Sequence, residues 1–162
     1  MPNTVPITKD DTACYWVFDP KHFSKTVPSC LSLDMKVFFS SGNSADPYKM
    51  SVNSKNLCEN YPKQIHDLGV VQAKSLTERN FKQDKEHEEI YAGYLKAEVH
   101  ELEDIVYEDH YTIVEHAPIE GNHMHCNVVL KFPEDLKKPK TSKRNRITDR
   151  INQCFGEDIE RP

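Results

Sequence analysis

The chain of 162 residues has no apolar run approaching the roughly 18–20 residues that a membrane-spanning helix requires. Its first residues, Met1–Pro6, also lack the basic and apolar regions of a secretory signal peptide. These absences predict a soluble protein that is neither membrane-bound nor exported. We therefore expect it in the cytoplasm.

Paired cysteines are missing as well. The five cysteines are widely spaced, and none belongs to a Cys-x-x-Cys pair, so neither a disulfide framework nor a thiolate zinc site is indicated. The sequence also contains no His-Glu-x-x-His helix, no Gly-x-Ser-x-Gly elbow and no glycine-rich phosphate loop. We expect reduced thiols and no metal, and no motif identifies a cofactor.

The composition, with 37% hydrophobic and 29% charged residues, fits one domain with a modest core. Strand-like and helix-like segments follow one another without strict alternation. This order predicts a single α+β domain with a mostly antiparallel sheet and two or three helices. We expect a loose tail at 1–12, a core at 13–136, and a basic linker with a final helix at 137–162.

Seven segments have the residue types or the alternation of β-strands. Their expected bounds are Cys14–Phe18, Met35–Ser40, Lys49–Val52, Val70–Leu76, Tyr94–Leu102, Tyr111–His116 and Cys126–Phe132. In the last of these, alternate residues are apolar and are expected to face the core.

Helical periodicity occurs in two places. Starting at Lys55 or Asn56, apolar residues recur at spacings of four, four and three up to Leu68, and Gly69 is expected to end this helix. The following charged stretch, Thr77–Glu89, is consistent with a solvated helix or a disordered excursion. A last helix, capped by Thr141 or Ser142, is expected to bury Ile147, Ile151 and Cys154 or Phe155 and to stop at Gly156.

The net charge of −5 is unevenly distributed. Lys137–Arg150 contains seven Lys/Arg and one Asp, whereas Asp84–Asp109 contains ten acids and two Lys. The acidic stretch resembles a charged insertion at about 80–109, and it is a candidate surface for a protein partner. Nucleic-acid binding through Lys137–Arg150 would require interleaved aromatic residues, and because these are missing we favour a solvated face.

Three of the eight histidines, His116, His123 and His125, lie at the junction of the two most regular strands. If these strands pair, Ala117–His125 connects them and the three imidazoles come close enough to consider a zinc site. Histidines in a polar loop are more often solvated or hydrogen-bonded locally, so we do not expect a metal.

A different hypothesis uses His125 as a general acid or base, with Asn122 or Asn127 orienting a substrate, because imidazole titrates near neutral pH. His110-Tyr111-Thr112 matches the His-x-Thr motif of two-histidine phosphoesterases. That fold requires two such motifs, and the sequence has no second one.

Several short patches together resemble a family of small uncharacterised bacterial proteins. They are Trp16 with Pro20 and His22, Ser51-Val52-Asn53, Gly69-Val70-Val71, and His116-Ala117-Pro118 followed by Asn122-His123-Met124-His125. The resemblance spans residues 16–130 except 80–109. It implies a Ser-Val-Asn/Asp element and a closing Pro…Asn-x-x-His segment, in which Asn122 and His125 match whereas His123 occupies a position where proline is commoner. The family has no assigned activity.

The order of an opening strand followed by a serine-bearing strand is also similar to the ADP-ribosyltransferase architecture, in which the serine lines the nicotinamide pocket. Trp16 or His22 lies near the place where that architecture has an arginine or histidine. No later catalytic glutamate can be singled out.

Together these features predict a polar pocket that recognises a small ligand or a nucleotide-bearing partner. Its expected binding residues are Ser51, Asn53, His116 and Asn122. One alternative is a nucleotide-directed transferase or hydrolase in which His125 is the catalytic acid or base. Another is a protein-interaction or immunity module without catalysis.

Overall fold

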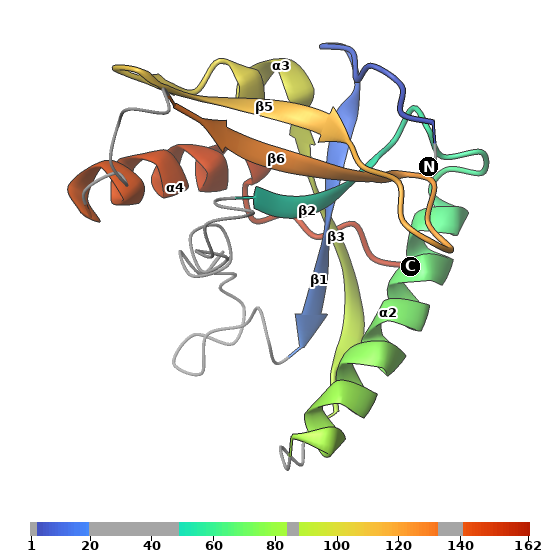
Figure 1. The fold of residues 1–162 in the computed structure, drawn as a ribbon. Helices are drawn as coiled ribbons and strands as arrows, with labels where there is room; N and C mark the ends of the chain where they lie inside the picture. The colour runs from blue at the N-terminus through green and yellow to red at the C-terminus, as the bar shows by residue number, and fades with distance from the viewer. Residues whose placement is uncertain (1–2, 20–48, 84–87, 133–140) are drawn as a thin grey trace.

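The computed structural model describes residues 3–19, 49–83, 88–132 and 141–162 (Figure 1). It contains one six-stranded sheet in the order β3-β1-β2-β6-β5-β4, in which all neighbouring strands are antiparallel. Three helices of the described residues accompany this sheet. The fold is therefore the α+β domain with an antiparallel sheet that the sequence predicts.

The strands of the sheet are short except for the two at one edge. Their bounds are β1 Thr12–Asp19, β2 Lys49–Ser54, β3 Ile90–Glu98, β4 Val106–Tyr107, β5 His110–His116 and β6 His125–Lys131. Four expected strands are confirmed, and each of their ends lies within two residues of its expected position. They are Cys14–Phe18, Lys49–Val52, Tyr111–His116 and Cys126–Phe132. The strand expected at Met35–Ser40 lies outside the described residues.

The helices cover opposite faces of the sheet. The helix α2 (Lys63–Lys82) packs on β1 and β3, whereas α3 (Val99–Glu103) and α4 (Thr141–Phe155) close the other face (Figure 1). The main core lies on the α3–α4 side, where alternate residues of β1, β2, β5 and β6 meet Ile147, Ile151 and Phe155 of α4. The last helix thus buries the residues expected from its spacing, and Gly156 follows it with a positive φ of 67°.

The strand expected at Val70–Leu76 is wrong, because this segment is the middle of α2. The buried residues of α2 are Ile65, Gly69, Ala73 and Leu76, which recur at helical spacing against the sheet. The β-branched Val70 and Val71 suggested a strand, yet they are 43% and 57% exposed. The periodicity of burial has overridden their local preference.

Gly69 does not end a helix either. It is buried within α2, and a Cβ placed on it would lie 2.3 Å from Cε1 of Tyr91. The glycine therefore permits close approach of the helix to β3. The helix also starts later than expected, at Lys63 after Pro62, whereas Leu57 and Tyr61 pack from the preceding turn. Gly69-Val70-Val71, one of the patches of the family resemblance, is helical.

Part of the segment interpreted as a charged insertion, about 80–109, belongs to the sheet as the strands β3 and β4. β3 pairs with β1 from Glu98 to Ile90, so the sheet would lose an entire edge without it. The strand expected at Tyr94–Leu102 begins earlier and gives way to α3 at Val99, because Val99 and Leu102 turn into the main core.

The residues expected to form a loose tail, 1–12, contact the sheet from Val5 onward. Ile7 packs against the main core, and the backbone N–H groups of Val99 and His100 donate to the carbonyls of Asp11 and Lys9.

None of the helices in the described part of the chain combines the length and apolar character needed to cross a membrane. The linker expected at Lys137–Ser142 lies outside the described residues up to Lys140, and its last two residues belong to α4.

Candidate functional site

A cavity of about 300 Å³ lies on the α2 side of the sheet, between α2 and the strands β1, β2 and β6. Small-molecule sites usually measure roughly 300–1,000 Å³, so this cavity has the size of a small ligand. Its lining residues come from β1, β2, α2, β6 and the loop after β5. They are Tyr15, Trp16, Phe18, Lys49, Met50, Ser51, Val52, Asn53, Gln72, Leu76, Arg79, Ile119 and His125.

Strand register explains why Ser51, Asn53 and His125 gather here. Asn53 lies opposite His125, and Ser51 lies opposite Asn127, in the antiparallel pair of β2 and β6. Opposed residues project from the same face of a sheet, as do residues two apart in one strand. Ser51, Asn53 and His125 therefore share the face on which the cavity opens.

Ser51 and His125 form a hydrogen-bonded pair. The Oγ of Ser51 lies 3.1 Å from Nε2 of His125, and Nδ1 of the same ring lies 2.6 Å from the carbonyl oxygen of Ala117. A carbonyl oxygen only accepts, so Nδ1 must carry the proton and Nε2 presents its lone pair to the serine hydroxyl. The backbone thereby fixes the tautomer that can accept a proton from Ser51.

The environment keeps the His125 ring neutral. Burial lowers the pKa of His125 below its ordinary value, and the positive charge of Lys49 acts in the same direction. The hydrogen bond to the Ala117 carbonyl opposes this shift without cancelling it. At neutral pH the ring is therefore a base with a free lone pair.

Asn122 supports the cavity from behind rather than lining it. Its Nδ2 donates to Oδ1 of Asn53 at 2.8 Å, and its Oδ1 accepts from the backbone N–H of Met124 at 3.0 Å. Asn53, Asn122 and Met124 are all buried. This arrangement ties the loop before β6 to β2, the strand that carries Ser51.

Replacing Asn122 by alanine is expected to lower the free energy of unfolding by about 2 kcal/mol, because two buried partners would lose their hydrogen bonds. Urea denaturation would measure this loss. Glu120→Ala, in the same loop but exposed, should change stability by less than about 0.5 kcal/mol. Equal effects of the two changes would contradict the bracing role of Asn122.

His116 lies on the other face of the sheet from the cavity. It opposes Cys126 in the β5–β6 pair and is buried. Its Nδ1 accepts from the N–H of Val5 at 2.9 Å, so Nε2 carries the proton and donates to the carbonyl of His123 at 2.8 Å. Both nitrogens are thus engaged in holding the N-terminal segment and the loop.

Of the five expected site residues, the structure brings together Ser51, Asn53 and His125. Asn122 does not line the cavity but is hydrogen-bonded to Asn53, which does. His116 lies on the opposite face of the sheet. Across residues 3–19, 49–83, 88–132 and 141–162, no three His, Cys, Asp or Glu side chains gather closely enough to hold a metal ion. His116 and His123 are near neighbours, with ring centroids 5.2 Å apart, but His125 points to the opposite face.

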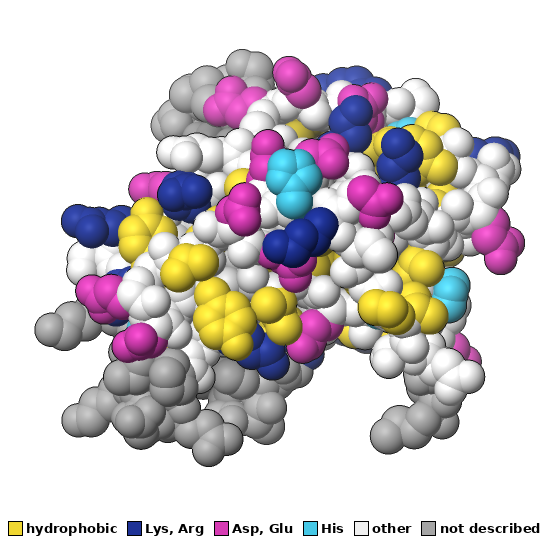
Figure 2. Space-filling model, turned by 90° about the horizontal axis from the view of Figure 1, so that it is seen from above, with side chains coloured by type: hydrophobic (Ala, Val, Ile, Leu, Met, Phe, Trp, Pro, Cys, Tyr) yellow, Lys and Arg dark blue, Asp and Glu magenta, His cyan; other side chains and the backbone are white. Residues whose placement is uncertain are grey.

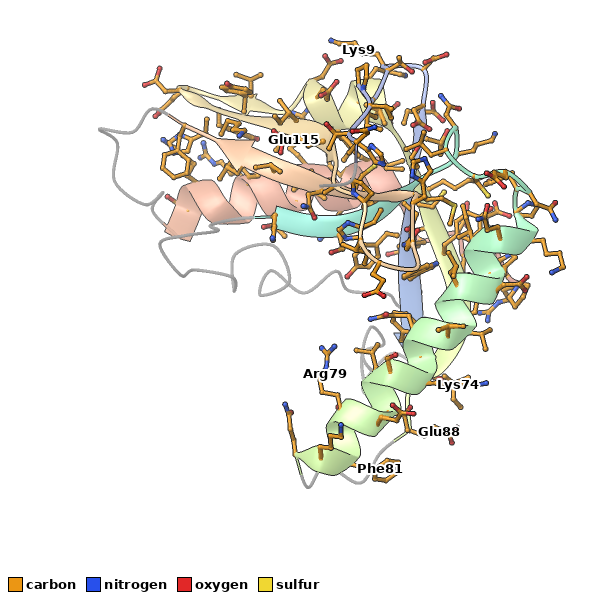
Figure 3. All side chains as sticks on the ribbon, turned by 45° about the vertical axis from the view of Figure 1, so that its right-hand side comes forward. Lys9, Lys74, Arg79, Phe81, Glu88 and Glu115 are labelled. Atoms are coloured by element: carbon orange, nitrogen blue, oxygen red, sulfur yellow. The ribbon has the colours of Figure 1, made fainter. Side chains whose placement is uncertain are left out.

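Sequence reasoning missed the α2 contribution to the cavity. Gln72, Leu76 and Arg79 line it at spacings of four and three, which is one side of a helix. Figure 3 shows Arg79 on the opposite side of α2 from Lys74. Because this segment was expected to be a strand followed by a charged stretch, its helical face was not recognised.

The His-x-Thr motif at His110–Thr112 faces the interior and not the cavity. The hydroxyl of Thr112 donates to the carbonyl of Leu102, and His110 is stacked on Phe132 with only 4% of its surface exposed. Neither ring nitrogen of His110 has a hydrogen-bond partner of good geometry among the residues that the structure describes, although the Tyr107 backbone interacts weakly with the ring. The motif is therefore explained by packing.

His110→Phe is expected to stabilise the protein by about 1 kcal/mol at pH 7, because it removes a buried polar group that lacks a partner. Burial, assisted by Lys143, lowers the pKa of His110, while Glu108 and Asp109 oppose the shift. The unfolded chain therefore binds more protons as pH falls below about 6.5, and stability falls with it. Urea titrations at pH 7.5 and 5.5 should show a larger gain at the lower pH.

The exposed His100 provides the control for this prediction. His100→Gln should leave the free energy of unfolding within about 0.5 kcal/mol of the wild type at both pH values. A destabilised His110→Phe variant would show that His110 has a stabilising interaction, and an unchanged pH dependence would show that the pKa of His110 is not lowered on folding.

The described lining of the cavity contains no Asp or Glu. The ADP-ribosyltransferase architecture would require a catalytic glutamate here. The cavity therefore gives no support to the comparison with ADP-ribosyltransferases. His22, the other residue of that analogy, lies outside the described residues. No protein-family model matches the chain, and neither the curated proteins nor the solved structures include a significant match.

Proposed function

We propose that the cavity binds a small anionic ligand with a flat ring, of the nucleotide class. The observation that carries this proposal is the lining itself, in which two cationic residues, Lys49 and Arg79, adjoin aromatic side chains and no carboxylate is present among the described lining residues. Cationic side chains in the wall of a cavity attract phosphate or carboxylate groups.

The aromatic part of the lining suits a flat ring. Nε1 of Trp16 donates to the carbonyl of Ile65 at 3.1 Å, which fixes the indole against α2. Phe18 contacts the indole edge, with ring centroids 6.5 Å apart. Flat rings such as nucleobases stack on aromatic side chains with a gain of roughly 1–3 kcal/mol. Ser51, Asn53 and His125 add hydrogen-bonding groups that would orient the ligand.

Thermal shift and calorimetry with AMP, ATP and NAD test this proposal, with adenosine and inorganic phosphate as partial ligands. Stabilisation by the nucleotides and a weaker effect of adenosine are expected. Arg79→Ala should weaken nucleotide binding about tenfold, equivalent to about 1.4 kcal/mol. Lys74→Ala, on the other side of the same helix, should leave it unchanged (Figure 3).

If no nucleotide in the panel stabilises the protein, the proposal is overturned. Equal losses for Arg79→Ala and Lys74→Ala would also overturn it, because a general effect of positive charge would then explain binding. Both residues are exposed, so neither change should alter the fold.

The protein-interaction alternative is favoured by a separate observation. A groove between α2 and β3 is lined by Val70, Ala73 and Ile90, with Lys74, Glu78 and Glu88 at its sides. Ile90 is 59% exposed at the edge of the sheet. Apolar side chains exposed beside a groove are typical of contact surfaces.

The acidic stretch Asp84–Asp109 was the first candidate surface for a protein partner. Viewed from above, where α3 lies, acidic side chains are interspersed with Lys and Arg and do not form one continuous patch (Figure 2). Sedimentation velocity of the wild type and of Ile90→Glu tests whether the groove binds a second copy of the chain. Dissociation caused by Ile90→Glu would support it, and two monomeric proteins would contradict it.

A further inference from the structure

We propose that Ser51 is a nucleophile activated by His125, and that the chain catalyses acyl transfer from activated esters to water. The substrate class is an acyl group on an anionic leaving group, which the cavity would hold through Lys49 and Arg79. The choice of an anionic leaving group rests on the proposed function. The chemistry of Ser51 and His125 does not depend on it.

The first support is the geometry of the pair. A serine is a weak nucleophile unless a base accepts its proton, and the base must lie within hydrogen-bond reach. Here Oγ of Ser51 and Nε2 of His125 are 3.1 Å apart. The two residues come from different strands, 74 positions apart in the chain, and no local turn accounts for their meeting.

The second support is the orientation of the base. The Ala117 carbonyl accepts the Nδ1 proton of His125 at 2.6 Å, so the lone pair on Nε2 faces the serine. In hydrolases with a Ser-His-Asp triad a carboxylate performs this orienting role. A neutral carbonyl orients the ring but stabilises the imidazolium less, so we expect slower turnover than a triad provides.

The third support is access. Ser51 is exposed and lines the cavity, in contrast to Ser54 on the same strand, which is buried and donates to Asp11 at 2.5 Å. Lys49 is two residues before Ser51, so its side chain projects from the same face of β2. A positive charge on this face would stabilise the negative oxygen of the tetrahedral intermediate.

The reaction has two balanced steps. Oγ of Ser51 attacks the acyl carbon while Nε2 of His125 takes the hydroxyl proton. The bond from carbon to the leaving oxygen then breaks, and His125 gives its proton to that oxygen or, where the leaving group departs as an anion, to solvent water, so that Nε2 is free again. Water next attacks the acyl-serine carbon, Nε2 accepts its proton, and Ser51 departs and regains a proton from His125. The products are a carboxylic acid and the leaving group.

A fluorophosphonate probe tests the nucleophile because it modifies activated serines covalently. Intact mass and peptide mapping of the wild type should show one adduct, located on Ser51. Ser51→Ala should abolish labelling, and His125→Gln should slow it by about 100-fold or more. The exposed Ser75 and His100 supply the controls, since Ser75→Ala and His100→Gln should label at the wild-type rate.

The pH dependence gives a second measurement that needs no variant. Labelling of the wild type should rise with pH as His125 loses its proton and reach a plateau near neutrality, with a midpoint below pH 6.5. Hydrolysis of 4-nitrophenyl acetate should follow the same profile. A rate that continues to rise up to pH 9 would indicate unassisted attack and would overturn the inference.

The outcomes separate this inference from the proposed function. An unlabelled wild type, an adduct elsewhere, or an unchanged rate in His125→Gln would overturn the nucleophile, even if nucleotides still stabilise the protein. Labelling of Ser51 that depends on His125, without stabilisation by any nucleotide, would support the nucleophile and overturn only the ligand class.

Discussion

Replacing Gly93 by alanine is expected to lower the free energy of unfolding by about 3 kcal/mol or more. Gly93 in β3 has φ +135°, a conformation that L side chains rarely adopt. A Cβ there would lie 2.2 Å from the backbone oxygen of Glu160 and 2.7 Å from Cγ2 of Ile159. The carbonyl cannot rotate away as a side chain would, because Glu160 is paired with Tyr94 through two backbone hydrogen bonds.

Gly121 provides the matched control for this loss. It also has a positive φ, +81°, but a Cβ there would meet nothing within 4 Å. Gly121→Ala should therefore show only the conformational cost, about 1 kcal/mol. Urea denaturation of both variants measures the difference, which reports the clash alone.

A truncation after Glu157 locates the clash. Removing residues 158–162 takes away Ile159 and Glu160, so Gly93→Ala should cost less in the shortened chain than in the full one. The two changes should then be non-additive by about 1–2 kcal/mol. Additive effects would show that Gly93 is required for its own conformation and not for the approach of the C-terminal segment.

Asp11→Ala is expected to destabilise the protein by about 3 kcal/mol. Asp11 is only 1% exposed, and its carboxylate accepts from the N–H of Thr12 at 2.7 Å, the N–H of Asn56 at 3.0 Å and the hydroxyl of Ser54 at 2.5 Å. Each hydrogen bond to a charged group contributes roughly 1.5–3 kcal/mol, and part of this is regained when the freed donors reach water. Urea denaturation would measure the loss.

The neighbouring Asp10 is the control for Asp11, because it is exposed and its carboxylate accepts a local hydrogen bond from the hydroxyl of Thr8. Asp10→Ala should change stability by less than about 0.5 kcal/mol. Comparable effects at the two positions would contradict a specific role for Asp11. Because Ser54 ends the strand that carries Ser51, Asp11→Ala should also slow labelling of Ser51.

The candidate site was partly accessible from the sequence. Ser51 and Asn53 were singled out by the Ser-Val-Asn element of the family resemblance, and His125 by the cluster of histidines beside the expected strand Cys126–Phe132. Their meeting depended on the pairing of β2 with β6, which are more than 70 residues apart, and no local pattern reports such a pairing. Arg79 was missed because two exposed valines made the middle of α2 resemble a strand.

Local chemistry thus determined the class of fold, the alternating strands β5 and β6, and the last helix with its stop at Gly156. These features follow from periodicity and from single-residue preferences, which act over a few residues. The tertiary structure alone decided which faces His116 and His125 occupy, that β3 belongs to the sheet, and that α2 continues through Gly69. The Ser51–His125 pair is also of this second kind, because strand order brings the hydroxyl to the ring and a main-chain carbonyl fixes the proton that leaves Nε2 free.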